Sequence, residues 1–184
     1  MLKYQKLVCV LLLLIFRYAD VYSQHSVEPN FKIDNLIAPT DYDVYDYLIG
    51  CDNNGNVYYV WLEAIYANPS SHRIMFRKST NYGQTFSLNP LGIPFTSPSN
   101  GVSFVKMVND NSGHIYVVWV NNVNGDRQVC FNRSIDYGQT WQSQEIRIDN
   151  GNNKDIPLSP ELNCDNNGHV YTAWQDNRNN GYHI

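Results

Sequence analysis

Short runs that are rich in β-branched and aromatic side chains recur along the chain. The clearest runs are Val57–Trp61, Ile115–Trp119 and Val170–Trp174. Such side chains fit a pleated, half-buried surface, and the best-matched unit shows no apolar stretch at helical spacing. An Asn-Gly or Ser-Gly pair precedes each run, and Asn-Gly supplies the positive φ angles of a tight hairpin turn. The pattern predicts antiparallel hairpins, with strands near 103–109, 114–121, 127–133 and 141–148 in the best-matched unit.

These runs belong to an internal repeat. The block Asp52–Trp61 recurs as Asp110–Trp119 and as Asp165–Trp174, so the tryptophans lie 58 and then 55 residues apart. A second block, Phe76–Phe86, aligns with Phe131–Trp141. A third signal, Phe31–Asn35, matches Ile146–Asn150. One unit therefore contains about four strand-like segments, and the chain holds two full units, a truncated third and one leading strand.

Four antiparallel strands in a period of about 55 residues are typical of a β-propeller blade, which buries its faces only against neighbouring blades. A β-sandwich is the structural alternative, but it does not explain a long period that keeps Trp and Gly in register. We therefore expect an all-β fold, and within it a β-propeller of four-stranded antiparallel blades.

One segment of each full repeat resembles a known family motif. Ser134–Trp141 is similar to the Asp-box, or bacterial neuraminidase (BNR) repeat, whose pattern is Ser-x-Asp-x-Gly-x-Thr-Trp. Ser79–Phe86 is a second copy, with Asn81 in place of Asp and Phe86 in place of Trp. We call 79–86 and 134–141 the Asp-box-like segments. The resemblance implies a sialidase-like propeller, typically of six blades, of which this chain supplies two and a half to three.

The resemblance places each Asp-box-like segment at the turn between the third and fourth strands of a blade. The residue types suit a folding device, because a carboxylate or amide accepts local backbone N–H groups, Gly takes the positive φ angle and the last aromatic packs into the blade. Asp136 is therefore predicted to be structural rather than a catalytic acid. The structural positions are Ser79, Asn81, Gly83, Thr85, Phe86, Ser134, Asp136, Gly138, Thr140 and Trp141.

The resemblance also raises the question of catalysis. In sialidases a triad of arginines grips the substrate carboxylate, a Tyr–Glu pair supplies the nucleophile and an Asp acts as acid/base. The first arginine normally lies in a Phe-Arg-Ile-Pro-like segment, where this chain has Phe31-Lys32-Ile33-Asp34. The sequence therefore favours a non-catalytic module that binds glycans or proteins, and the alternative is a fragment of an exo-α-sialidase.

The family's topology implies a ligand face built by the loops from strand two to three and from strand four to one. Here these are about 62–72, 121–127 and 175–181, with 35–46, 89–102 and 149–160. Aromatic faces beside hydrogen-bonding acids suit sugar rings, and alternating Asp and Tyr could instead hold calcium. Solvated loop residues and a local Asp176–Arg178 ion pair are the plainer alternatives. The ligand-face candidates are Asp41, Asp43, Tyr45, Asp46, Arg127, Asp176 and Arg178.

The first 23 residues are typical of a secretion signal, since Lys3 and Lys6 precede the apolar run Leu7–Phe16 and Ser23 offers a cleavage point. The run is too short to span a bilayer. We expect a mature domain of residues 24–184 that is secreted, periplasmic or at the cell surface, without a membrane segment after cleavage, and that meets glycans or cell-surface glycoproteins.

Charge and cysteine content narrow the functions further. The formal net charge is −4, and removing three cations and one anion with the signal leaves −6, which disfavours nucleic-acid binding. Cys51, Cys130 and Cys164 lack zinc spacing, and the Asp-Asn-Asn-Gly turns lack the later ligands of a calcium loop. We therefore predict no metal and no cofactor.

Cys51 and Cys164 occupy equivalent places two units apart and should stay unpaired. A chain of two and a half units should also leave blade faces bare.

Overall fold

A computed structural model describes residues 42–65, 68–95, 101–149, 157–177 and 184. The chain divides into two compact units, Met1–Asn35 and Leu36–Ile184, and all the described residues belong to the second. The expected secretion signal and the leading strand Phe31–Asn35 lie outside the described residues, as do the candidates Asp41 and Arg178.

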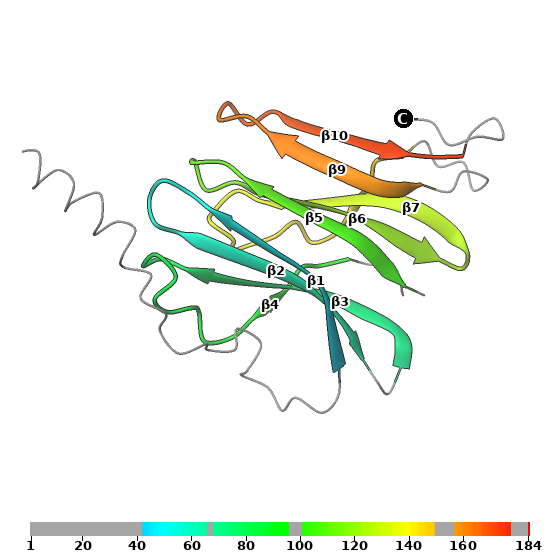
Figure 1. The fold of residues 1–184 in the computed structure, drawn as a ribbon, viewed down its shortest axis with the longest axis horizontal. Helices are drawn as coiled ribbons and strands as arrows, with labels where there is room; N and C mark the ends of the chain where they lie inside the picture. The colour runs from blue at the N-terminus through cyan, green and yellow to red at the C-terminus, as the bar shows by residue number, and fades with distance from the viewer. Residues whose placement is uncertain (1–41, 66–67, 96–100, 150–156, 178–183) are drawn as a thin grey trace, which may run out of the picture. The chain divides into compact units, whose positions relative to one another are not determined.

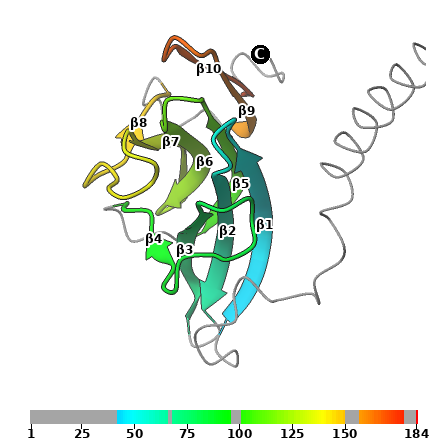
Figure 2. The same ribbon diagram turned by 90° about the vertical axis from the view of Figure 1, so that its left-hand side faces the viewer.

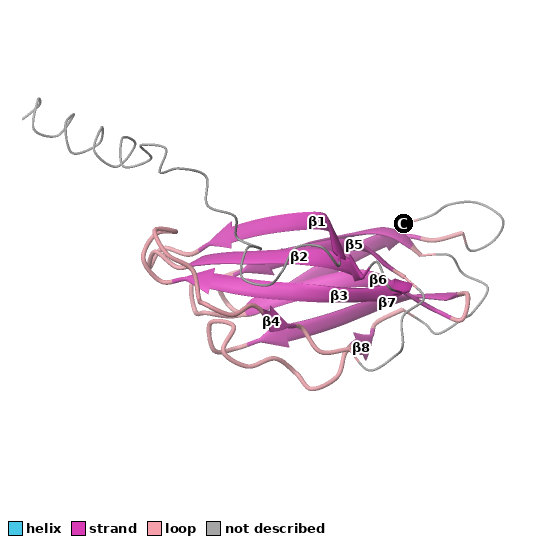
Figure 3. Cartoon of the chain, turned by 90° about the horizontal axis from the view of Figure 1, so that it is seen from below, coloured by secondary structure: helices cyan, strands magenta, loops and turns pink. Residues whose placement is uncertain are grey.

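The described residues form antiparallel strands and no helix (Figure 3). Sheet A contains β1 (Tyr42–Cys51), β2 (Val57–Ile65), β3 (Asn68–Ser79) and β4 (Leu91–Gly92) in that order. Sheet B repeats the order with β5 (Val102–Asn109), β6 (Ile115–Val123), β7 (Asp126–Ser134) and β8 (Ile146–Arg147), and sheet C contains β9 (Leu158–Cys164) and β10 (Val170–Gln175). The predictions of an all-β fold and of four antiparallel strands in each of the first two repeats are confirmed (Figure 2).

Two boundary predictions are wrong. The fourth strand of the best-matched unit was expected over 141–148, but only Ile146 and Arg147 pair with β7. Trp141 packs edge-to-face on Phe76 of sheet A, 5.3 Å between ring centroids, and Gln142 N–H bonds to the Arg133 carbonyl of β7 (3.2 Å) outside the paired residues. The loops expected at 62–72, 121–127 and 35–46 are also shorter, because β1, β2, β3, β6 and β7 extend into them.

The hairpin turns before β2, β6 and β10 need a positive φ angle at one residue only. Asp52 N–H donates to the Asn56 carbonyl (3.1 Å), and Gly55 N–H reaches the Asp52 carbonyl at 3.4 Å. Gly55 has a φ of 82°, whereas Asn54 does not adopt a positive φ. This is a three-residue loop in which a type I turn is followed by one left-handed glycine. Only the glycine therefore needs the positive φ angle that the sequence analysis assigned to the Asn-Gly pair.

The main core lies between sheets A and B. Tyr58, Val60 and Leu62 of β2 and Ile74 and Phe76 of β3 form one wall, and these side chains are almost fully buried. The opposite wall comes from sheet B and includes Val102, Val105, Ile115, Val117, Trp119 and Cys130. Strand β6 is buried on both faces from Ile115 to Asn121, as expected for a strand between two neighbouring sheets.

A β-bulge lies opposite the repeated tryptophan in every sheet. Two residues of the first strand, Asp46 and Tyr47, oppose the single residue Trp61. Phe104 and Val105 oppose Trp119 in the same way, and Ser159 and Pro160 oppose Trp174. The first bulge residue always has a positive φ: 42° at Asp46, 56° at Phe104 and 47° at Ser159. Because a bulge bends its strand, the first strand of each sheet curves at the same level.

The first strands of the three sheets, β1, β5 and β9, lie next to one another and run in the same direction (Figure 1). Their hairpin turns lie side by side, because Asn53 N–H donates to Asn111 Oδ1 (3.0 Å) and Asn111 Nδ2 donates to Asn166 Oδ1 (3.2 Å). We call this the turn end. The other end, where β1, β5 and β9 begin and β2, β6 and β10 finish, is called the loop end. Cys51 and Cys164 are free thiols that belong to sheets A and C.

Candidate functional site

The second Asp-box-like segment is a closed turn at the turn end. Ser134 Oγ accepts the Gly138 N–H (2.9 Å), and Asp136 Oδ1 accepts the Thr140 N–H (2.8 Å). Thr140 Oγ1 donates to Asp136 Oδ2 (2.6 Å), and Ser134 Oγ donates to Asp136 Oδ1 (2.7 Å). Burial raises the pKa of Asp136, but the hydrogen bonds from Thr140 and Ser134 outweigh it and lower the pKa to about 2. Both carboxylate oxygens are thus engaged within the segment.

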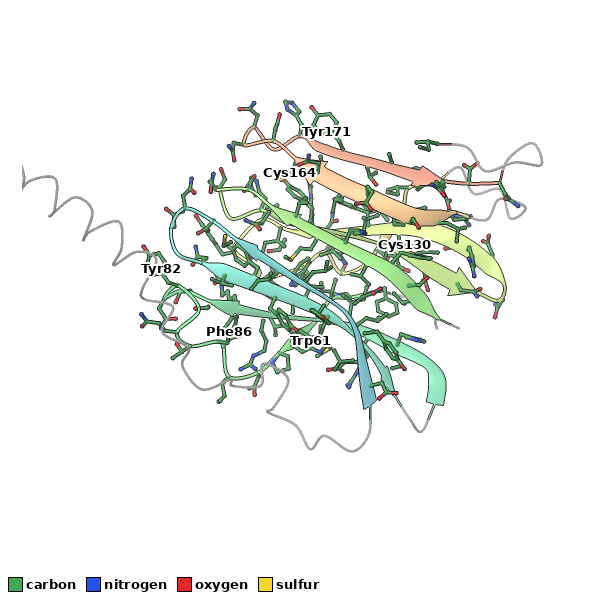
Figure 4. The ribbon with its side chains drawn as sticks, in the orientation of Figure 1. Trp61, Tyr82, Phe86, Cys130, Cys164 and Tyr171 are labelled. Carbon is green, nitrogen blue, oxygen red and sulfur yellow. The ribbon has the colours of Figure 1, made fainter. Side chains whose placement is uncertain are left out.

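The first Asp-box-like segment makes the same turn without a charge. Gly83 N–H donates to Ser79 Oγ (2.9 Å), and Thr85 N–H donates to Asn81 Oδ1 (2.9 Å). Asn81 Nδ2 donates to Thr85 Oγ1 (2.9 Å), which reverses the direction of the hydrogen bond seen between Thr140 and Asp136. Phe86 takes the place of Trp141 and is half-buried (Figure 4). An amide can therefore replace the carboxylate because threonine both donates and accepts.

A tyrosine of each Asp-box-like segment packs on the glycine of the neighbouring hairpin turn. Tyr82 N–H donates to the Gly55 carbonyl (2.8 Å), and Tyr137 N–H donates to the Gly113 carbonyl (2.8 Å). A Cβ on Gly55 would lie 2.7 Å from the Tyr82 ring, and one on Gly113 would lie 2.6 Å from the Tyr137 ring. Both positions therefore require glycine for space as well as for φ. The sequence analysis missed this contact, although Asp-x-x-Gly and Tyr-Gly occur together in both full repeats.

At the loop end, three ligand-face candidates lie on β1. Tyr45 Oη donates to Asp43 Oδ2 at 3.1 Å, and this hydrogen bond and the carboxylate charge raise the pKa of Tyr45. Asp46 is exposed at the bulge with a φ of 42°. Tyr45 and Tyr47 are 49% and 73% exposed, so both rings are open to solvent. The acidic and aromatic cluster is thus part of an edge strand and not of the loop that the sequence suggested.

The remaining candidates belong to the other two sheets. Arg127 lies on β7 opposite Asn122, and its half-buried side chain makes no ion pair with the described residues. Asp176 follows β10 directly and is 2% exposed, so it is a buried acid rather than a solvated loop residue. The structure therefore distributes the described candidates over one end of three sheets: Asp43, Tyr45 and Asp46 on sheet A, Arg127 on sheet B and Asp176 on sheet C.

The sequence analysis underrated a polar position two residues after each repeated tryptophan. Glu63, 3% exposed, accepts Trp61 Nε1–H (2.8 Å) and pairs with Arg73 (2.7 Å). The equivalent of Glu63 is Asn121 in sheet B and Asp176 in sheet C. The pattern Trp-x-Glu, Trp-x-Asn, Trp-x-Asp was readable in the repeat, and it marks a buried polar site at the loop end of every sheet.

In sheet B the polar residue at this position is Asn121, and its hydrogen bonding is incomplete. Asn121 is 0% exposed, and among the described residues its side-chain N and O atoms lack hydrogen-bond partners, as does Trp119 Nε1. Asn is one methylene shorter than Glu, and Gln128 stands opposite Asn121 where Arg73 stands opposite Glu63. Buried polar atoms normally find a partner, and an ordered water bridging Trp119 and Asn121 would supply one.

Two of the arginines at the loop end are already paired with carboxylates. Arg73 bonds to Glu63 (2.7 Å), while Arg147 bonds to Asp126 (2.8 Å) and to Asp149. Asp149 also accepts the Val129 N–H (2.9 Å). Burial lowers the pKa of Arg147, but the two aspartates raise it by more, so this guanidinium stays charged. These internal pairs occupy donors that a ligand's carboxylate would otherwise use.

Within the described ranges, no three His, Cys, Asp or Glu side chains gather as they would around a metal ion. The described part of the chain also contains no helix that is long and apolar enough to cross a membrane.

No protein-family model matches the chain. A search of curated proteins finds no match either.

Proposed function

We propose that the chain is an exported, sialidase-like Asp-box module that builds a β-propeller and binds a glycan or glycoprotein at its loop end without cleaving it. The propeller part is supported by the arrangement of the sheets. Strand β5 contacts both β1 and β9, so the first strands of three sheets neighbour one another. Strand order follows chain order within each sheet, and three sheets in succession suit blades better than the two layers of a sandwich.

The observation that carries the binding proposal is the exposed face of β1 at the loop end. Tyr45 and Tyr47 present rings to solvent, and Asp43 and Asp46 lie within the same five residues. Aromatic rings cover the apolar face of a sugar, while carboxylates accept hydrogen bonds from its hydroxyl groups. The bulge at Asp46 and Tyr47 places two adjacent side chains opposite one partner residue, which brings an acid and a ring together.

The pairing of the arginines supports binding without hydrolysis. A sialoside carboxylate would need free guanidinium groups, and Arg73 and Arg147 are held by Glu63, Asp126 and Asp149. One observation favours the alternative, a piece of an exo-α-sialidase: the hydrogen bond from Tyr45 to Asp43 places a phenol beside an acid, as a tyrosine nucleophile requires.

The test uses the full chain on an array of sialylated and desialylated glycans. Replacing Tyr45 or Tyr47 with Ala should weaken binding by about tenfold, equivalent to about 1.4 kcal/mol. Ile135→Ala is the matched control, because Ile135 is 62% exposed but lies in the Asp-box-like segment at the turn end. Equal binding by all variants, or an absence of glycan binding, would contradict the proposal.

A fluorogenic sialoside distinguishes the two functions. We expect no release of the fluorophore by the full chain. Release that is abolished in Tyr45→Phe, which retains the ring and removes the hydroxyl, would establish the hydrolytic alternative instead.

A further inference from the structure

We propose that the first bulge residues of the three sheets, Asp46, Phe104 and Ser159, form one row that binds an uncharged glycan chain, with Phe104 as the central stacking ring. We call these three residues the bulge row. The inference rests on the proposed function, because it extends the binding face of β1 onto β5 and β9. It adds a ligand class, a neutral rather than a sialylated glycan, and a binding residue outside β1.

The bulge row lies on neighbouring strands at one level. Each of its residues is the first of two that oppose the repeated tryptophan of its sheet. Residues in equivalent places of the repeat touch across both strand boundaries. Asn109 Nδ2 donates to the Cys51 carbonyl (2.9 Å) between β5 and β1, and Lys106 Nζ lies 3.0 Å from Glu161 Oε1 between β5 and β9. The strands are therefore in register, and the three bulge residues lie side by side.

Phe104 is an unfavourable residue for its backbone conformation. Its φ is 56°, in a region that a short polar side chain such as that of Asp46 tolerates and that makes a bulky ring a steric outlier. The core does not explain the ring, because Phe104 is 37% exposed and does not belong to the core cluster of the described residues. Strained residues concentrate at ligand sites. We therefore assign the ring of Phe104 to contact with a ligand.

The bulge row combines a ring with hydrogen-bonding groups. Asp46 and Ser159 are exposed on either side of Phe104. A ring covers the apolar face of a pyranose, while a carboxylate and a hydroxyl bind sugar hydroxyl groups. Tyr45 and Tyr47 flank Asp46, so exposed rings occur on both β1 and β5. Because one pyranose stacks on one ring, this arrangement suits a chain of sugar units better than a single terminal sugar.

The charges on the first strands favour an uncharged glycan. Asp43 and Asp46 are acids on β1. Lys106 is the only Lys or Arg within β1, β5 and β9, and it is paired with Glu161. Arg127 belongs to β7, the third strand of its sheet. The carboxylate of a sialylated glycan would therefore meet two acids beside the bulge row and no unpaired cation on the first strands.

The probe is a set of glycan pairs on an array, in which the two members of a pair differ only by a terminal sialic acid. The full chain should bind the neutral member at least about tenfold more tightly. Asp46→Asn should reduce this preference, because it removes one of the repelling charges. Raising the salt concentration should also reduce the preference, since exposed charges are screened.

Variants of Phe104 test the stacking ring. Phe104→Ser introduces the residue that β9 carries at its own bulge, and it should weaken binding to the neutral glycan at least about tenfold. It should not lower the melting temperature, because the smaller side chain relieves steric strain at the positive φ angle. Phe104→Tyr restores a ring and should recover binding. Ile146→Ser is the matched control, since Ile146 is 46% exposed but lies on β8, the outermost strand of the same sheet.

The outcomes separate this inference from the proposed function. Binding that is lost in Tyr45→Ala or Tyr47→Ala but kept in Phe104→Ser would overturn the bulge row and leave the glycan-binding function standing. Tighter binding of the sialylated members would overturn the assigned ligand class in the same way. An absence of binding to every glycan on the array would overturn the proposed function, and the bulge row with it.

Discussion

Single residues hold the turn end of this protein together through local hydrogen bonds. Asp52 Oδ1 accepts the N–H groups of Asn54 (2.9 Å) and Asn56 (3.0 Å), and Asp52 Oδ2 accepts Tyr58 Oη–H (2.9 Å). Burial raises the pKa of Asp52, but these hydrogen bonds lower it by more. Asp136 plays the same part in its own turn, and its carboxylate is stabilised in the ionised form.

Asp136 should therefore contribute a pH-dependent term to stability. Its pKa is about 2 in the folded chain and about 3.9 in an unfolded chain. Because the folded pKa is the lower one, the stabilisation is present above pH of about 4 and is lost as the pH falls through about 2. Asp136→Asn should lower the free energy of unfolding at pH 7 by about 1 kcal/mol after allowance for solvent screening, and the difference should vanish near pH 2.

The measurement is urea unfolding of both proteins between pH 2 and 7. The first Asp-box-like segment provides the control, because Asn81 already holds the same turn without a charge. Asn81→Asp should add a pH dependence in the same window. A difference between wild type and Asp136→Asn that stays constant across this range would contradict the assigned role.

The second strands of sheets A and B carry equivalent residues at the loop end, but the polar side chains of these residues differ in their hydrogen bonding. On β2, Glu63 bonds to both Trp61 and Arg73, whereas the polar side-chain atoms of Trp119 and Asn121 on β6 have no partner in the part of the chain that the structure describes. The strands have the same register, since Glu63 opposes Arg73 and Asn121 opposes Gln128. Two substitutions, at Asn121 and Gln128, should therefore reproduce in sheet B the pair that Glu63 and Arg73 form in sheet A.

We expect Asn121→Glu alone to destabilise the chain by about 2–3 kcal/mol, because it places an unpaired charge in a fully buried position. Adding Gln128→Arg should recover more than half of that loss by recreating the pair of Glu63 and Arg73. Gln128→Arg alone should change stability by less than about 0.5 kcal/mol and serves as the control. Equilibrium urea unfolding measures all three variants. A neutral Asn121→Glu would mean that the site is open to water.

Across the whole molecule, sheets A and B share one core and should unfold together. Phe76 of β3 stacks on Tyr58, and a Cβ on Gly138 of the second Asp-box-like segment would lie 2.2 Å from its ring. Lys78 of the same strand donates to the Tyr137 carbonyl (2.9 Å). These contacts connect β3 of sheet A to the second Asp-box-like segment, which follows β7 of sheet B.

Phe76→Ala should lower the free energy of unfolding by about 3–5 kcal/mol, the cost of deleting a fully buried ring. Hydrogen exchange followed by mass spectrometry should show the amides of β2 and β6 losing protection together, since the cavity opens between their sheets. Leu88→Ala, at a side chain that is 72% exposed, is the control and should leave exchange unchanged. Unchanged protection in β6 would show that the sheets unfold independently.

The sequence by itself determined the elements that depend on short-range patterns. The β-branched and aromatic runs, the Asp-x-x-Gly turns and the Ser-x-Asp/Asn-x-Gly-x-Thr pattern each act within about ten residues. Strand boundaries of β5, β6 and β7 were therefore predicted to within two residues, and the hydrogen bonds of the two Asp-box-like segments follow from their residue types. The candidates Asp43, Tyr45 and Asp46 were expected in a loop over 35–46, whereas the structure places them on β1.

Only the tertiary structure decided the features that depend on packing between distant segments. The bulges have Asp46, Phe104 and Ser159 at their positive φ positions, and these unlike residues share no local signal. They arise opposite Trp61, Trp119 and Trp174, which the neighbouring strand supplies. The burial of Asp176, which is 2% exposed, likewise has no local signal in the sequence. Local propensity can specify a strand or a turn, but packing against another sheet specifies where that strand bends and which of its polar residues is buried.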